Sequence, residues 1–226
     1  MKSFVVDDRV VEVPEWVVDL ESFRRWCDDD DFPENAHVSY LRGSVWVDLS
    51  MEQLYSHNRV KSQFTIIVGG MIETRDLGIY FSDGAYISNV EANISNQPEG
   101  MFVSYETLGQ GRVKDIEGRA EGYVELEGSP DMVLEVVSRS SVGKDTEVLR
   151  EAYFQAGIRE YWLVDARQPP LKFDILRPGT TGFVAVRKRG GWTRSEVFAT
   201  SFRLTERRDR SDRPAFTLEA RADEPS

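Results

Sequence analysis

The sequence predicts an α/β fold, and two patterns indicate it. Residues 132–137 form an apolar run with strand character, residues 144–156 follow with helical periodicity, and residues 160–165 form a second apolar run. A strand, a helix and a strand within about 35 residues make a βαβ-like unit. Upstream, apolar residues recur at helical spacing over residues 51–72, which predicts one long helix with a single apolar face.

Chain length and charge distribution predict one main domain with two extensions. At roughly 150 residues per domain, 226 residues are enough for one domain with a sizeable core. The first 50 residues hold 12 acidic and 5 basic side chains, whereas residues 201–226 alternate six of each. We therefore expect an acidic N-terminal extension over residues 1–35, the main domain over 36–200, and a charged, loosely ordered tail over 201–226.

The remaining elements follow from short apolar runs and the turn residues between them. A short helix is expected over residues 20–29, where its four closing aspartates read as a solvated helix end. Residues 106–122 are rich in glycine and charge, which predicts a loop or an irregular hairpin. Residues 192–198 are expected to pair with 183–187 across two glycines. Further strands are expected at 37–42, 44–49, 78–82, 85–89, 101–104 and 171–176.

The composition excludes several classes of protein. One cysteine, Cys27, excludes an internal disulfide and a cysteine-rich zinc site, and two histidines exclude a three-histidine metal centre. No apolar run approaches the ~18 residues that span a membrane. The start of the chain shows no signal-peptide pattern, so a cytoplasmic protein is expected. A net charge of −11 argues against indiscriminate DNA binding, which depends on lysine and arginine.

One carboxylate lies inside an apolar strand. Its position needs a structural or functional explanation, because burying an unpaired carboxylate costs free energy. This residue is Glu135, and the structural alternative is a buried glutamate paired with an arginine. Asp131 shares its strand face and is a further candidate metal ligand, although four residues separate the two backbones by ~13 Å. A closer partner for a cation at Glu135 is therefore expected elsewhere. Glu99, just after Pro98, is that candidate, unless it belongs to a plain turn.

These segments resemble a known family. Residues 130–138 (PDMVLEVVS), 153–158 (YFQAGI) and 160–165 (EYWLVD) are similar to the Uma2 family of restriction-endonuclease-like proteins, assigned to the PD-(D/E)XK nuclease superfamily. Two weaker matches lie upstream, at residues 50–57 (SMEQLYSH) and 96–100 (NQPEG). The resemblance runs from about His37 to Leu176. It implies a restriction-endonuclease-like domain, with a mixed central sheet flanked by helices.

The resemblance also implies a chemistry, the hydrolysis of phosphodiester bonds with Mg²⁺ or Mn²⁺. Glu99 stands where the family usually has the aspartate of its first motif, and Glu135 stands at the second carboxylate. Two carboxylates can hold a hard divalent ion, which polarises the phosphate and activates water. Glu52, on the first helix, is an auxiliary ligand or orienting residue. His57 reads more simply as a helix histidine satisfied by a neighbour.

The expected lysine is missing from both of its usual positions. The superfamily position holds Val137, and the helix position that many family members use holds Leu149. Lys144, at the start of the helix, is favoured as the replacement, with Arg150 as the alternative. Either residue can also be an ordinary surface side chain. A lysine here would position the attacking water and offset charge in the transition state.

A second group of basic residues suggests a contact with nucleic acid. Residues 187–194 place a tryptophan among four basic side chains in one predicted hairpin, where they could touch phosphates or form a solvated turn. The four are Arg187, Lys188, Arg189 and Arg194.

Two functional hypotheses follow. The first is a Mg²⁺-dependent endonuclease acting on nucleic acid, with DNA the expected substrate, no membrane partner, and a homodimer possible because cutting both strands takes two sites. The second is a catalytically impaired nuclease-fold protein that serves as a binding or regulatory module, as the missing lysine and the glutamate at position 99 suggest. A small-molecule hydrolase with the same pocket is a third option.

Overall fold

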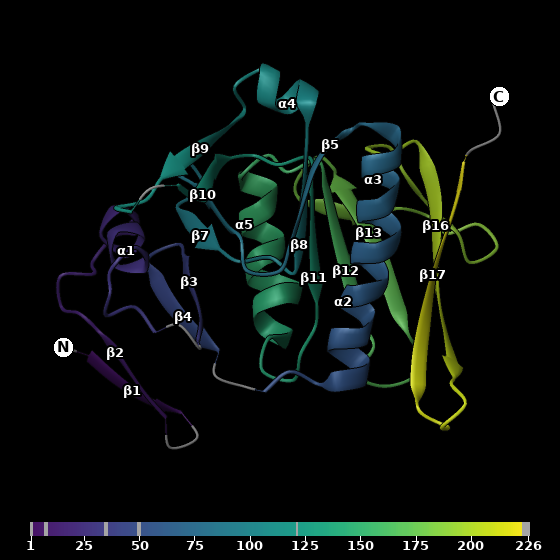
Figure 1. The fold of residues 1–226 in the computed structure, drawn as a ribbon, viewed down its shortest axis with the longest axis horizontal. Coiled ribbons are helices and arrows are strands. Elements are labelled where there is room, and N and C mark those ends of the chain that lie inside the picture. The colour runs from purple at the N-terminus through teal and green to yellow at the C-terminus, as the bar shows by residue number, and fades with distance from the viewer. Residues whose placement is uncertain (1, 7–8, 34–35, 49–50, 121, 223–226) are drawn as a thin grey trace.

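The computed structural model describes residues 2–6, 9–33, 36–48, 51–120 and 122–222. Its centre is a mixed six-stranded sheet in the order β14-β13-β12-β11-β8-β5, with helices packed on it (Figure 1). The predicted α/β fold with a mixed central sheet is confirmed. The strands are β5 (Gly78–Ser82), β8 (Gly100–Ser104), β11 (Met132–Val136), β12 (Glu160–Asp165), β13 (Lys172–Pro178) and β14 (Phe183–Ala185).

The predicted βαβ unit forms the middle of this sheet. Strands β11 and β12 pair in parallel, with Met132 opposite Glu160 and Val136 opposite Val164. A parallel pair needs a crossover connection. The helix that provides it consists of η3 (Lys144–Val148), a π-helical turn, and α5 (Leu149–Gln155). The crossover therefore brings the start of this helix to the end of β11.

The predicted long helix also forms, as four consecutive segments that include two π-helical turns. These are η1 (Leu54–Asn58), α2 (Arg59–Phe64), η2 (Thr65–Gly69) and α3 (Gly70–Arg75). Ser50, which directly precedes the predicted helix, lies outside the described residues. The apolar stripe Val60, Phe64, Val68 and Ile72 is fully buried, against Leu134 and Trp162 among others.

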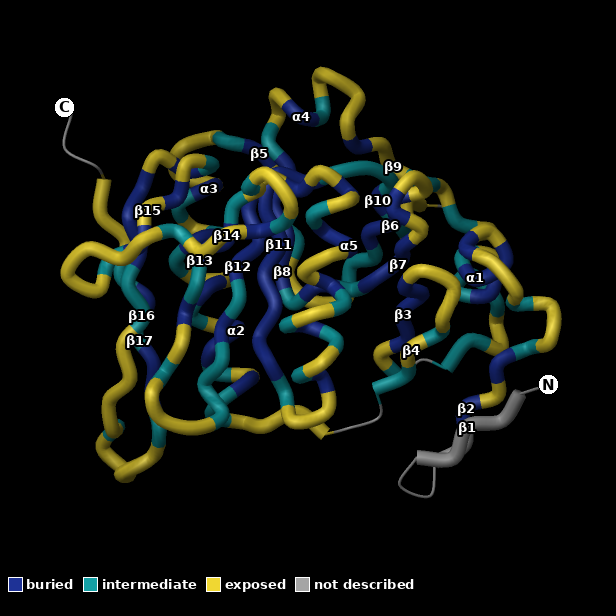
Figure 2. Tube along the Cα trace, turned by 180° about the vertical axis from the view of Figure 1, so that it is seen from behind, coloured by how far each residue is buried: buried dark blue, intermediate teal, exposed yellow. Residues whose placement is uncertain are grey.

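Strand β11 is buried along its whole length (Figure 2), and its residues divide between two cores. Leu134 belongs to the core under the long helix, whereas Val133 packs with Leu149 and Tyr153 of α5. Successive side chains of a strand point to opposite faces, so the two helices cover opposite faces of the sheet. Glu135 therefore points to the α5 face, as Val133 does.

A second six-stranded sheet, in the order β4-β3-β7-β6-β10-β9, covers the N-terminal side. The segment predicted as a loop or an irregular hairpin begins with a short helix, and the strand that follows pairs antiparallel with the next one, with a register shift, as in an irregular hairpin. The N-terminal helix packs Phe23 and Trp26 on this side. The elements are β1 (Lys2–Val6), β2 (Arg9–Val13), α1 (Leu20–Cys27), β3 (His37–Leu41), β4 (Ser44–Asp48), β6 (Tyr86–Asn89), β7 (Ile94–Asn96), α4 (Tyr105–Gly109), β9 (Val113–Glu117) and β10 (Tyr123–Gly128).

The C-terminal segment differs from the expected loosely ordered tail. Strands β15 (Thr193–Ser195), β16 (Thr200–Arg208) and β17 (Pro214–Ala222) form an antiparallel three-stranded sheet, in which β15 pairs with β16 rather than with β14. The charged segment contains a few apolar residues that pack into the core, and these explain why it forms a sheet. Phe202 lies 4.8 Å from Trp162 between ring centroids, and Phe216 and Leu218 join the core under the long helix. Among the described residues, no helix has the length and apolarity to cross a bilayer.

Candidate active site

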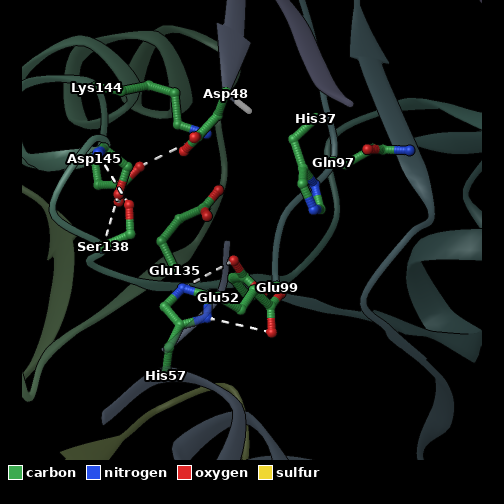
Figure 3. Close-up of a pocket in the computed structure, with 11 residues that line it drawn as sticks. His37, Asp48, Glu52, His57, Gln97, Glu99, Glu135, Ser138, Lys144 and Asp145 are labelled. Atoms are coloured by element: carbon green, nitrogen blue, oxygen red, sulfur yellow. Dashed lines mark hydrogen bonds and ion pairs between the residues drawn. The ribbon is translucent and has the colours of Figure 1, made fainter. Parts of the chain in front are cut away.

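A polar pocket lies where the end of β11, the start of the long helix, the start of β8 and the start of η3 meet (Figure 3). Five carboxylates, two histidines and one lysine lie among its lining residues. The lining is His37, Asp48, Glu52, His57, Gln97, Glu99, Glu135, Ser138, Ser141, Lys144 and Asp145. The pocket therefore unites Glu52, Glu99, Glu135 and Lys144, four residues that the sequence predicts for one site.

Glu135 is buried, with 2% of its surface exposed, and its neighbours are not the arginine of the structural alternative. Its Oε1 accepts hydrogen bonds from Tyr153 Oη at 2.7 Å and Asn96 Nδ2 at 3.0 Å. Burial raises the pKa of Glu135 well above its usual value, and the nearby Asp145 and Glu99 carboxylates raise it further, against the effect of Lys144. A cation in the pocket would therefore favour the ionised form.

Lys144 points into the pocket, and the alternative Arg150 does not. The Lys144 side chain is 15% exposed, and its Nζ lies 3.9 Å from Asp145 Oδ1. Burial acts to lower the pKa of Lys144, but the facing carboxylates, Glu135 first, outweigh burial and raise it. Arg150 instead donates to the carbonyl of Phe183 at 2.6 Å, and Leu149 is fully buried in the core.

Asp145 is a pocket residue that the sequence analysis missed. It is 1% exposed and accepts a hydrogen bond from Ser141 Oγ. Its other oxygen, Oδ1, is buried and has no hydrogen-bond partner among the described residues. Burial raises the pKa of Asp145 to about 6, although Lys144 acts to lower it. Its position directly after Lys144 was the available signal.

Glu99 lies between two basic side chains. Its Oε1 is 3.3 Å from His57 Nε2, and its Oε2 is 2.9 Å from Lys61 Nζ. Burial acts to raise the pKa of Glu99, but His57 and Lys61 outweigh burial and lower it to about 2. His57 Nε2 also lies 2.7 Å from the carbonyl oxygen of Val136, so this histidine links the helix to the end of β11. Glu99 is therefore held in its ionised form.

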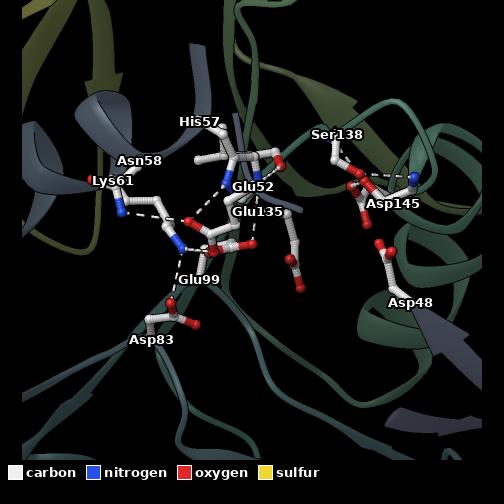
Figure 4. A network of polar contacts seen from close by, with 12 residues as sticks. Asp48, Glu52, His57, Asn58, Lys61, Asp83, Glu99, Glu135, Ser138 and Asp145 are labelled. Carbon is white, nitrogen blue, oxygen red and sulfur yellow. Dashed lines mark hydrogen bonds and ion pairs between the residues drawn. The ribbon is translucent and has the colours of Figure 1, made fainter. Parts of the chain in front are cut away.

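Lys61 is a second residue that the sequence analysis missed. It is 7% exposed and lies among three carboxylates: Glu52, Asp83 at 2.8 Å and Glu99 at 2.9 Å (Figure 4). Burial acts to lower its pKa, but these carboxylates raise it. Its spacing of four residues from His57 puts both on one helix face and was a usable signal.

Three side chains at this side of the pocket can each offer one ligand atom to the same ion. The offered atoms of Glu52, His57 and Glu99 lie within 4.8 Å of one another. The His57 Nδ1 atom is 3.7 Å from Glu52 Oε2. Glu52 thus lies beside the pocket as the resemblance implied, and it also pairs with Lys61.

The structure does not bring Asp131 into the pocket. Its carboxylate, at the opposite end of β11, accepts hydrogen bonds from Ser104 N at 2.8 Å, Thr107 Oγ1 at 2.9 Å and Arg159 Nη1 at 2.9 Å. The length of the strand and these three donors explain why it cannot share an ion with Glu135. We therefore remove Asp131 from the candidate ligands.

The predicted basic hairpin also lies apart from the pocket lining. Lys188 Nζ pairs with Asp174 at 2.9 Å. Arg187 lines a separate surface groove together with Arg159 and Arg177. Neither these residues nor Arg189 and Arg194 line the pocket. Their role in binding nucleic acid stays a prediction.

Comparisons with known proteins agree with this arrangement. The family model Uma2, described as "Putative restriction endonuclease", matches residues 20–206. One similar solved structure is "a putative nuclease belonging to DUF820" from Anabaena variabilis, which is 16% identical and has a TM-score of 0.59 over 80% of this chain and 91% of that chain. None of the curated proteins compared with the chain matches it. Because the family model covers most of the chain, this protein belongs to the Uma2 family of restriction-endonuclease-like proteins.

Proposed function

We propose that this protein is a nuclease that hydrolyses phosphodiester bonds in nucleic acid with the help of Mg²⁺ or Mn²⁺, and that DNA is its substrate. One observation carries the proposal. Glu99, Glu135 and Lys144 come from three separate segments and line one pocket, in a chain of a family described by nuclease activity. This is the set of charges that phosphodiester hydrolysis requires.

The residues of the pocket fit a hard divalent cation. Its donors are mostly carboxylate oxygens, which Mg²⁺ and Mn²⁺ prefer. The buried Asp145 Oδ1, without a hydrogen-bond partner in the described part of the chain, and the raised pKa of Glu135 both favour a positive charge nearby. Glu99 and Glu135 would hold the ion, and Glu52 would assist. The bound ion would polarise the scissile phosphate and acidify water.

The surrounding residues hold these carboxylates in place. Tyr153 and Asn96 both donate to Glu135 Oε1, and no described residue donates to Oε2, which is therefore available to a cation. His57 and Lys61 orient Glu99. Lys144 places an ammonium group at the pocket wall, where it would stabilise negative charge that develops on the phosphate.

One observation favours the alternative, a nuclease-fold binding module without catalysis. The two oxygens of Glu99 already face His57 and Lys61, so the ion would share this carboxylate with two basic groups. If His57 and Lys61 hold Glu99 more strongly than a cation does, the pocket remains a network of ion pairs without a bound cation.

Cleavage assays separate the two functions. Supercoiled plasmid, single-stranded DNA and RNA are incubated with Mg²⁺ or Mn²⁺, beside Glu135→Gln and the control Glu147→Gln, which makes the same change at an exposed residue of η3. Metal-dependent cleavage that only Glu135→Gln abolishes supports the nuclease. No cleavage, together with no Mn²⁺ binding in calorimetry, supports the binding module.

Two further predictions accompany the proposal. A homodimer would bring two pockets to the two strands of a duplex, and light scattering tests the mass directly. A cytoplasmic location is also proposed, in keeping with a chain that has one cysteine.

A further inference from the structure

The turn between β16 and β17 carries the arginine tip, which we define as Arg207, Arg208, Arg210 and Arg213. All four side chains are exposed. The tip projects at the same edge of the molecule as the start of the long helix (Figure 1). Residues 206–213 hold these four arginines beside Glu206, Asp209 and Asp212, so the segment carries a small net positive charge in a chain of net charge −11.

Several contacts fix the tip beside the helix that carries His57. Arg59 Nη1 donates to Asp209 Oδ2 at 2.8 Å and to the carbonyl of Pro214 at 3.0 Å. Arg213 Nη1 donates to the hydroxyl of Tyr55 at 2.7 Å. Tyr55 precedes His57 by two residues. The tip is therefore anchored to the first turn of the helix at the pocket.

The charges of the tip are available to a ligand. The carboxylate of Asp209 accepts hydrogen bonds from Arg59 and from the backbone amides of Ser211 and Arg213, so it does not neutralise the arginines of the tip. Arg208 donates to a backbone carbonyl, that of Asp212. None of the four arginines forms an ion pair with a carboxylate of the described residues. Lys188 of the other basic hairpin, in contrast, is neutralised by Asp174.

We propose that the arginine tip binds the phosphate backbone of nucleic acid that flanks the scissile bond. The proposal rests on the proposed function, because it gives the substrate of the pocket a second contact. A guanidinium group matches phosphate oxygens with paired donors, and such contacts position a nucleic acid without reading its sequence. A duplex carries one negative charge per about 1.7 Å of its axis, so phosphates flank a scissile bond on both sides. The acidic remainder of the surface would confine binding to this edge.

Binding is measured by fluorescence anisotropy with labelled duplex DNA, in the Glu135→Gln background so that the probe stays intact. The tip variant combines Arg207→Gln, Arg208→Gln and Arg210→Gln, which are exposed and spare the anchors. The matched control combines Arg42→Gln, Arg112→Gln and Arg119→Gln, three exposed arginines that lower the net charge equally. We expect the tip variant to lose at least about tenfold in affinity, and the control to stay within about twofold.

The salt dependence sharpens this test. Each lost phosphate contact lowers the slope of log K against log salt by about 0.9, so the tip variant is expected to lose about 2 to 3. Equal losses in tip and control variants, or no loss in the tip variant, would overturn the proposal. A loss confined to a triple variant of Arg187, Lys188 and Arg189 would also overturn it and favour the other hairpin.

The two proposals can fail separately. If the wild-type protein cleaves DNA and the tip variant keeps its affinity and its KM, the proposed binding role of the arginine tip is wrong and the proposed nuclease activity is supported. If the wild-type protein binds DNA through the tip but cleaves nothing, the proposed nuclease activity is wrong and the proposed binding role of the tip is supported. If it cleaves RNA or single-stranded DNA instead, the same variants are measured with that probe. If it binds no nucleic acid, both proposals fall.

Discussion

Two buried carboxylates, Asp131 directly before β11 and Glu135 near its end, share one face of the strand and have opposite surroundings. Asp131 is 0% exposed and receives a backbone amide, a hydroxyl and the guanidinium of Arg159. Glu135 is 2% exposed and accepts hydrogen bonds from two neutral donors on one oxygen, with Lys144 and the carboxylates of Asp145 and Glu99 nearby. From the sequence, both are candidate metal ligands on one face of the strand.

The difference separates a carboxylate that supports the fold from one that we propose to act in the site. A buried carboxylate with a charged partner and full hydrogen bonding supports the fold, and removing it leaves its partners unsatisfied. A buried carboxylate among other carboxylates destabilises the protein until a cation arrives, which is the usual signature of a site. The predictions below test this contrast, from the largest expected effect to the smallest.

Glu135→Gln is expected to lower the cleavage rate at least about 1,000-fold, because the pocket loses a charge that acts on the reacting phosphate. The same change removes a buried carboxylate whose raised pKa costs stability, so the melting temperature should stay or rise. Plasmid cleavage and thermal unfolding without metal measure the two effects. A variant that unfolds far more readily than the wild-type protein would contradict the contrast.

Asp131→Asn is expected to show the reverse. Ser104 N, Thr107 and the half-exposed Arg159 lose a charged acceptor at a buried position, and the free energy of unfolding should fall by about 1–3 kcal/mol. The folded fraction should still cleave within a few-fold of the wild-type rate. Urea denaturation and assays on folded protein measure this, and a selective loss of cleavage would return Asp131 to the site.

Acid should destabilise the protein through Glu99. Its pKa in the folded protein is about 2, below its ordinary 4.5, so the stability it contributes is present above pH 4.5 and is lost as pH falls toward 2. The contribution of Glu99 to the free energy of unfolding is at most about 3 kcal/mol. Glu99→Gln should flatten the decline of unfolding free energy in this window, whereas Glu147→Gln should follow the wild-type curve. Parallel curves for all three proteins would disprove the assignment.

Lys61→Met is expected to tighten Mn²⁺ binding about tenfold, because the ammonium at 2.9 Å from Glu99 Oε2 repels a cation held by the same carboxylate. Lys61→Arg keeps the charge and should stay within about twofold of wild type. Calorimetry measures both affinities. Weaker binding in Lys61→Met would show that Lys61 acts mainly by orienting Glu99.

The sequence supports the sheet, both main helices and four of the charged pocket residues, because each depends on local pattern, on a family motif or on its place in a predicted helix. Glu135 shows itself as a charge in an apolar strand. Lys61, Asp48 and Asp145 were missed, because their role depends on elements that meet only in three dimensions. The C-terminal hairpin was missed because charged residues surround its few apolar anchors, among them Phe202.

The hydrogen bond between His57 Nε2 and the carbonyl of Val136 joins positions 79 residues apart. Contacts of such sequence separation form only after much chain entropy has been lost, and they slow folding. Since this bond ties the helix beside Glu99 to the strand that carries Glu135, the pocket is completed only when helix and sheet have docked. Cation binding during refolding would therefore follow the docking of helix and sheet, and chains in which the two have not docked would carry no complete pocket.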